Sequence, residues 1–356
     1  MRKNDAASVS GLPGRMVAIG GAVLLAALLT GLPAATRAAE PPALGLPLDC
    51  QPGKTCWLVN YVDHDPGKGR RDYKCGDYTY NVPGKDGNRH RGTDIAIRDL
   101  DAMNKGVPVL AAASGTVFRL RDGMADVNVK KIGVDKVKGK QCGNAVILKH
   151  AGGWQTQYCH MRRGSLAVKK GQPVAAGDKL GLVGLSGFTE YPHLHITVRK
   201  GGTVIDPFIG RNRHKGCGLG EKPLWSKQAL ALLSYPPSAV YTAGFAAHKP
   251  NGSAVRAGKL NGATLPAKAA ALVLWADTYQ PRTGDRLQFI ISGPKGWKEF
   301  RHTVAIKKDR ARMFRFAGRK SKGGPWPKGS YQGTVTLWRG EPPKPVSRLQ
   351  KNIEIR

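Results

Sequence analysis

Residues 193–198 read HLHITV, an alternation of histidine with apolar and β-branched side chains. Successive side chains of an extended strand point to opposite faces, so His193 and His195 project to the same face. The stretch therefore predicts a β-strand that carries two imidazoles side by side. One of them can bind a metal ion while the other faces a substrate.

The sequence around this strand has the same character. Between about residues 76 and 215, short apolar and β-branched runs alternate with glycine-containing turns, which predicts an all-β fold with little helix. Residues 145–149 and 154–160 flank a glycine turn and predict a β-hairpin. This hairpin brings Cys142 and Cys159 close together, and they are the best candidates for a disulfide.

The first forty residues have the layout of an export signal. Basic residues at positions 2, 3 and 15 precede an apolar run at 16–29, and small residues follow at 34–39. We assign residues 1–39 to a secretory signal peptide. The apolar run is short for a membrane span, so we expect no stable transmembrane span after processing, with an uncleaved anchor as the alternative. The chain is exported in either case, to the periplasm or the cell exterior.

Cysteine content and composition divide the rest of the chain. The six cysteines are an even number with no CxxC pair, which favours three disulfides over a cysteine zinc site. Seven or so short strands near the C-terminus suggest an immunoglobulin-like β-sandwich. The expected parts are an irregular, disulfide-tied extension at 40–75, a β-rich domain at 76–218, a linker at 219–237 and the sandwich at 238–356.

The chain is strongly basic. It holds 57 Lys and Arg against 24 Asp and Glu, a net charge of +33, and residues 238–356 hold 23 against 6. This excess favours an anionic cell-envelope surface as a partner. The charge alone also fits a nucleic-acid binder, but the export signal and the lack of a recognisable module argue against one. Whether the C-terminal domain binds such a surface or supports its neighbour stays open.

A second pattern adds metal-binding residues. In the stretch HRGTD at residues 90–94, His90 and Asp94 share a face if the segment is extended, so both can reach one ion. His160 ends the second hairpin strand and adds a further imidazole. Two imidazoles and one carboxylate make a three-ligand zinc set with one open position, which is the arrangement of catalytic zinc.

Four blocks of sequence carry a family resemblance. They are HRGTDIA at 90–96, GNAVILKH at 143–150, QYCHM at 157–161, and GLSG at 184–187 leading to PHLH at 192–195. In this order they resemble the blocks of lysostaphin-like (LytM-type) M23 zinc metallopeptidases. The resemblance implies a β-rich domain with an open groove for a peptide. It also implies that His90, Asp94 and His195 bind Zn²⁺ and that His160 and His193 are catalytic.

The same resemblance implies an activity and a substrate. Such an enzyme is a zinc endopeptidase that hydrolyses peptide bonds, here stem-peptide cross-links, in bacterial peptidoglycan. The alternative is an inactive M23-like scaffold or activator of other cell-wall hydrolases, although all five polar positions are intact. Glu190 and Tyr191 stand where many relatives have small residues. We expect the other histidines, at 64, 150, 214, 248 and 302, at the surface.

Overall fold

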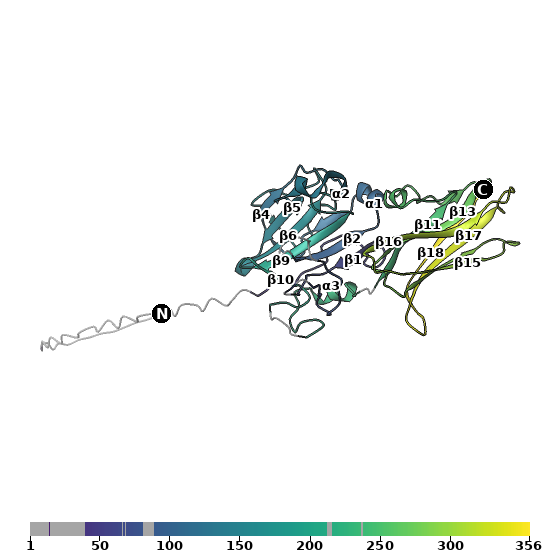
Figure 1. Ribbon diagram of the computed structural model, residues 1–356. Coiled ribbons are helices and arrows are strands. Elements are labelled where there is room, and N and C mark those ends of the chain that lie inside the picture. The colour runs from purple at the N-terminus through teal and green to yellow at the C-terminus, as the bar shows by residue number, and fades with distance from the viewer. Residues whose placement is uncertain are drawn as a thin grey trace, which may run out of the picture. The chain divides into compact units, whose positions relative to one another are not determined.

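The computed structural model describes residues 40–65, 67, 69–80, 89–211, 216–235 and 238–356, together with Gly14 (Figure 1). Apart from Gly14, the predicted signal peptide therefore lies outside the described residues, as does His214. Among those that are described, none of the helices has the length and apolar character needed to cross a bilayer.

Within the described part of the chain, eight strands form one large sheet in the order β1-β2-β9-β6-β5-β4-β7, with β10 paired to β9 (Figure 1). Every pairing in it is antiparallel. The strands are β1 (Cys56–Asn60), β2 (Thr93–Ile97), β4 (Gly115–Arg121), β5 (Asn144–Lys149), β6 (Trp154–Met161), β7 (Pro173–Val174), β9 (His193–Lys200) and β10 (Thr203–Ile205).

Short elements border this sheet. Strands β3 (Pro108–Leu110) and β8 (Lys179–Leu182) form a separate antiparallel pair. Helix α1 (Leu100–Lys105) follows β2, and the Asp99 carboxylate caps it by accepting from the amide of Ala102 at 2.8 Å. Helices α2 (Val129–Ile132) and α3 (Lys227–Leu232) are each a turn or two long.

The two faces of the large sheet differ because side chains alternate along each strand. In β9, Leu194, Ile196 and Val198 are buried in the main hydrophobic core. The intervening His193 and His195 point to the opposite face, as the alternation predicts. The mostly β fold expected from the sequence is confirmed.

Two segments are more ordered than the sequence indicated. Residues 56–60, inside the predicted irregular extension, form the edge strand β1, whose Cys56 and Leu58 enter the main core. The predicted linker likewise contributes Trp225 and Leu233 to that core. Strand β1 extends the sheet at its edge, and the linker residues pack against its apolar side chains, which would otherwise be exposed to water.

Three disulfides join all six cysteines, each of which lies in the described residues: Cys50–Cys56, Cys75–Cys217 and Cys142–Cys159. The predicted hairpin bridge between Cys142 and Cys159 is confirmed. Disulfides persist in oxidising compartments, so this pattern indicates an exported protein.

The C-terminal strands pack as two sheets, which we call the C-terminal sandwich. Its described strands form a three-stranded sheet, β11-β13-β16, and a five-stranded sheet, β12-β18-β17-β14-β15 (Figure 1). Phe245, Leu274, Phe289 and Val335 come from both sheets and share one buried core. The strands are β11 (Ala239–Ala246), β12 (Thr264–Leu265), β13 (Ala271–Tyr279), β14 (Arg286–Ser292), β15 (Phe300–Ala305), β16 (Arg312–Lys320), β17 (Gly329–Arg339) and β18 (Lys344–Ile355), with helix α4 (Gly252–Arg256) between β11 and β12.

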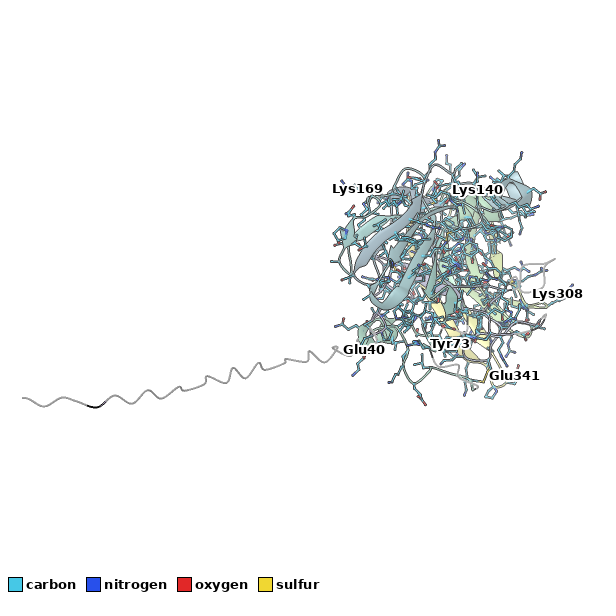
Figure 2. The ribbon with its side chains drawn as sticks, turned by 90° about the vertical axis from the view of Figure 1, so that its left-hand side faces the viewer. Glu40, Tyr73, Lys140, Lys169, Lys308 and Glu341 are labelled. Carbon is cyan, nitrogen blue, oxygen red and sulfur yellow. A yellow bond between two sulfur atoms is a disulfide. The ribbon has the colours of Figure 1, made fainter. Side chains whose placement is uncertain are left out.

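Many basic side chains of the two regions lie at the surface. Lys140 and Lys169 near the large sheet and Lys308 in the C-terminal sandwich are exposed (Figure 2). Exposed ammonium groups keep their hydration, so they make the surface potential positive without the desolvation cost of a buried charge.

Candidate metal centre

Three side chains that are far apart in sequence meet on the polar face of the large sheet. His90 Nε2 lies 3.1 Å from Asp94 Oδ1 and 3.0 Å from His195 Nδ1, and His195 Nδ1 lies 2.8 Å from Asp94 Oδ1. All three candidate ligand atoms fall within 4.8 Å of one another. Their spacing therefore allows them to hold one metal ion.

Strand pairing explains this convergence. Strands β2 and β9 are neighbours, and Asp94 is paired directly with His195 across them. Opposite residues on one face of an antiparallel pair lie about 5 Å apart at Cβ, so their side chains meet. His90 lies just before β2, where it is 3% exposed.

In each of these side chains, the polar atom that faces away from the group also makes a hydrogen bond. His90 Nδ1 donates to the carbonyl of Tyr61 at 2.6 Å, which leaves the Nε2 lone pair facing inward. Asp94 Oδ2 accepts from Asn60 Nδ2 at 3.0 Å, and His195 Nε2 lies 2.9 Å from Thr197 Oγ1. Metal ligands are characteristically oriented by such outer hydrogen bonds, so the donor set fits a zinc ion.

Gly92 permits the close approach of the two strands. A Cβ at this position would lie 2.5 Å from the carbonyl oxygen of Ile196 and 2.6 Å from His195 Nε2. Both distances are shorter than van der Waals contact, so glycine is required here by space rather than by backbone angle.

Two further imidazoles lie beside this group. The ring centres of His160 and His193 are 4.7 Å apart, and the ring of His160 is 6.0 Å from that of His195. His193 Nε2 is 3.6 Å from Asp94 Oδ1. The structure thus brings together all five residues that the sequence singled out.

Hydrogen bonds fix the orientation of both rings. His160 Nδ1 donates to the carbonyl of Ser186 at 2.7 Å, and His193 Nδ1 donates to the carbonyl of Tyr191 at 2.9 Å. Each Nε2 is therefore left as the proton acceptor. The backbone of His160 has a φ of 60°, a left-handed conformation that costs a non-glycine residue about 1–3 kcal/mol.

Electrostatics separate the titration behaviour of these groups. Burial, together with the neighbouring imidazoles of His193 and His195, holds the pKa of His160 well below its usual range. Burial opposes ionisation of Asp94, but His90 and His193 outweigh it and hold the pKa of this carboxyl well below its usual range. Asp94 is therefore an anion and His160 a neutral base near neutral pH.

Sequence reasoning missed part of this site. Asn60 lies in the segment predicted to be irregular, and its contact with Asp94 had no signal in the spacing of residues. Tyr191, noted as a departure from the family pattern, packs on His193 with ring centres 5.0 Å apart. Tyr80 stacks on His90 at 4.4 Å, where burial raises the pKa of its phenol well above the usual value.

The remaining histidines take no part in the group. His248 and His302 are exposed, as expected, and His64 is half-buried with Nε2 2.7 Å from Asp206 Oδ2. The expectation for His150 is wrong: it is 6% exposed and bridges Ser114 and Thr156.

Comparison with known proteins agrees with the geometry. Residues 88–207 match the model of peptidase family M23. The peptidoglycan DD-endopeptidase ShyA of Vibrio cholerae is 32% identical over 106 residues, which are 30% of this chain and 19% of that protein. The DD-carboxypeptidase/endopeptidase Mpg of Neisseria meningitidis is 33% identical over 119 residues, or 33% of this chain and 22% of that protein.

Other similarities cover shorter or more distant relatives. The cell division protein DipM of Caulobacter vibrioides is 45% identical over 64 residues, 18% of this chain and 10% of that protein. The catalytic domain of lysostaphin from Staphylococcus simulans is 25% identical with a TM-score of 0.26, covering 40% of this chain and 85% of that one. The chain spans only about a tenth to a fifth of the length of these three curated relatives.

The matched segment contains the three candidate metal ligands, His160 and His193. Residues 88–207 of this chain are a peptidase family M23 domain.

Proposed function

We propose that this protein is an exported zinc endopeptidase that hydrolyses peptide bonds, most specifically stem-peptide cross-links, in bacterial peptidoglycan. The observation that carries the proposal is the meeting of His90, Asp94 and His195 within 4.8 Å, with two further imidazoles beside them. The family match and the names of the relatives support the substrate class.

In this proposal His90, Asp94 and His195 hold the metal. Zinc at such a site, when bound, polarises a scissile carbonyl and lowers the pKa of a water molecule to about 7. The hydrogen bonds from Asn60 and to Tyr61 keep the Asp94 oxygen and the His90 nitrogen directed at the ion. Their outer contacts thereby reduce the reorganisation needed on binding.

His160 and His193 handle the protons and the developing charge. With Nδ1 bonded to the carbonyl of Ser186 and its pKa lowered, the His160 imidazole accepts a proton at Nε2 from the attacking water. His193 presents its own Nε2 next to Asp94, where its protonated form donates a hydrogen bond to the oxyanion. The proton that His160 took from the water passes to the leaving amine.

The proposed location is the periplasm of a Gram-negative cell, since the disulfides require an oxidising compartment and the substrate lies there. The positive charge would hold the enzyme near the anionic envelope, and added salt would weaken this attraction.

The direct test is digestion of purified peptidoglycan by the mature protein, with and without a zinc chelator, and identification of the new termini by mass spectrometry. We expect chelator-sensitive release of free stem-peptide ends. His160→Ala and Asp94→Ala should each abolish release while the protein stays folded by circular dichroism. A folded, zinc-loaded protein that releases no peptide would instead support the inactive scaffold.

A further inference from the structure

Strand β1 contains an irregularity at the metal centre. Its register with β2 pairs Leu58 with Ile95 and then Asn60 with Asp94, so Val59 is an extra residue with no partner in the ladder. A β-bulge of this kind redirects the side chain that follows it. Here it places Asn60 opposite Asp94, where its amide donates to Oδ2.

The C-terminal sandwich binds the bulge. Gln280, which follows β13, donates from Nε2 to the carbonyl oxygen of Val59 at 3.3 Å. The backbone N–H of Gln280 donates to the carbonyl of Ala311 at 3.0 Å. The backbone carbonyl of Gln280 accepts from Ser238 Oγ at 2.5 Å. Gln280 also has a φ of 51°, a conformation that L-residues seldom adopt and that often marks functional contacts.

A buried aromatic cluster extends the same contact. Trp57 of β1 packs edge-on against Tyr241 of β11 with ring centres 5.6 Å apart. Tyr191 lies 6.0 Å from Tyr279 of β13 and carries the guanidinium of Arg312 over its ring at 5.8 Å. The sandwich therefore packs directly on Tyr191.

Tyr191 in turn touches the site on two sides. Its ring lies 5.0 Å from that of His193, its carbonyl accepts from His193 Nδ1, and its hydroxyl accepts from Asn60 Nδ2 at 3.4 Å. Through Asn60 and Tyr191, the surface that the sandwich covers borders both Asp94 and His193.

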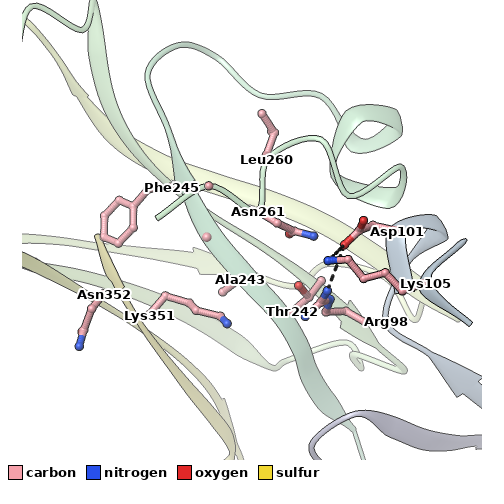
Figure 3. A pocket seen from close by; sticks show the side chains of 12 residues that line it. Arg98, Asp101, Lys105, Thr242, Ala243, Phe245, Leu260, Asn261, Lys351 and Asn352 are labelled. Carbon is pink, nitrogen blue, oxygen red and sulfur yellow. Dashed lines mark ion pairs between the residues drawn. The ribbon is translucent and has the colours of Figure 1, made fainter. Parts of the chain in front are cut away.

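Polar contacts hold the sandwich in place away from the bulge. Arg282 makes two hydrogen bonds to the carboxylate of Asp77, and Asn261 Nδ2 donates to Asp99 Oδ2 at 3.1 Å. Asn261 lies near Asp101 and Lys105 of α1 (Figure 3). The three residues line part of a cavity of about 270 Å³. The attachment thus also reaches Asp77, after β1, and Asp99, the N-cap of α1.

We propose that the C-terminal sandwich is a positioning element of the metal centre. Gln280 holds the bulge at Val59 so that Asn60 directs Asp94 toward the ion, and Tyr279 with Arg312 holds Tyr191 against His193. This inference rests on the proposed zinc function, and it gives the sandwich a role at the site in addition to any binding of the cell envelope.

Zinc affinity of the full mature chain, measured by competition with a chromophoric chelator, tests the proposal. Gln280→Gly removes the side-chain amide. It also relieves the left-handed backbone conformation at this position, because glycine adopts that conformation freely. We expect its zinc affinity to fall about 3- to 10-fold, less than the roughly 10- to 100-fold typical of losing a partner that bonds a ligand directly. Asn60→Ala, which loses such a partner, should fall in the larger range.

The thermal midpoint separates positioning from general stability. The Tm of Gln280→Gly should equal or exceed that of the wild type, since the backbone strain is relieved. The matched control is Val335→Ala, which truncates a fully buried side chain of the sandwich core away from β1. It should lower Tm and leave zinc affinity unchanged.

Gln280→Glu provides a second comparison, because it keeps the length of the side chain but has no N–H to donate to Val59. It should weaken zinc binding as Gln280→Gly does. The positioning proposal is overturned if both Gln280 variants bind zinc as the wild type does, or if Val335→Ala weakens binding as much as they do. A wild-type chain that binds no zinc overturns the proposed function itself and the positioning proposal with it.

Discussion

Substitution of Gly92 by alanine should damage the metal centre through a backbone clash. The new Cβ would lie 2.5 Å from the carbonyl oxygen of Ile196, about 0.9 Å inside ordinary contact at roughly 3.4 Å. Overpacking of this kind costs about 1–3 kcal/mol. Since Ile196 pairs with Thr93, relief requires β2 and β9 to separate where Asp94 meets His195.

The expected result has two parts. Tm should fall by about 2–12 °C, since 1 kcal/mol corresponds to roughly 2–4 °C in a domain of about 150–250 residues. Displacement of a reacting or ligating group by about 1 Å costs on the order of 100-fold in rate, so peptide release should fall by a similar factor.

Calorimetry and the peptidoglycan digestion assay measure these effects. The matched control is Gly324→Ala, whose added Cβ would meet no atom within 4 Å and whose φ is not left-handed, so Tm and activity should stay unchanged. A Gly92→Ala protein with wild-type Tm and wild-type activity would refute the steric reasoning.

Three further predictions concern the core and the disulfide beside the site. Replacing both Cys142 and Cys159 by serine opens a loop of 17 residues and should cost about 3 kcal/mol in denaturant unfolding; an unchanged midpoint would contradict this. Asp277→Ala leaves Arg312 without its carboxylate partner at 3.0 Å and should cost about 3 kcal/mol in the free energy of unfolding, measured by calorimetry. Asp309→Ala, which removes one partner of an exposed ion pair, should cause no such loss. Burial raises the pKa of Tyr158 to about 12 in the folded protein, above about 10 in the unfolded chain. The contribution of Tyr158 to the free energy of unfolding should therefore be fully present below about pH 10 and be lost as the pH rises toward about 12. The fall in stability over this range should be smaller in Tyr158→Phe.

Part of the candidate site could be predicted from sequence because the signals of that part are local. The alternation in residues 193–198 places two histidines on one face, and the hairpin places His160 at its end. The pairing of Asp94 with His195, 101 residues apart, is a matter of sheet order. Periodicity does not reveal that order, and the family resemblance supplied it.

The supporting contacts could not be predicted in the same way. Asn60 reaches Asp94 only because of a one-residue bulge, and bulges have no distinct sequence pattern at this position. Gln280 contacts a carbonyl 221 positions away, and a backbone carbonyl carries no residue identity to read. His150 was misplaced because a hairpin turn indicates exposure, whereas Ser114 and Thr156 bury its ring.

The irregular structure predicted for residues 40–75 is wrong at residues 56–60 for a related reason. Residues 40–75 are rich in proline, glycine and charge, which indicates irregular structure. Residues 56–60 nevertheless pair with β2 and form the edge strand of the sheet. Tertiary packing outweighs local propensity where an apolar face must be covered.

The most direct measurement is the stoichiometry and position of zinc in the purified mature chain, by elemental analysis and anomalous X-ray diffraction at the zinc edge. The account predicts one zinc per chain, bound by His90, Asp94 and His195, and loss of that zinc in Asp94→Ala with the fold retained. A folded wild-type protein that takes up no zinc, or binds it elsewhere, would contradict the account.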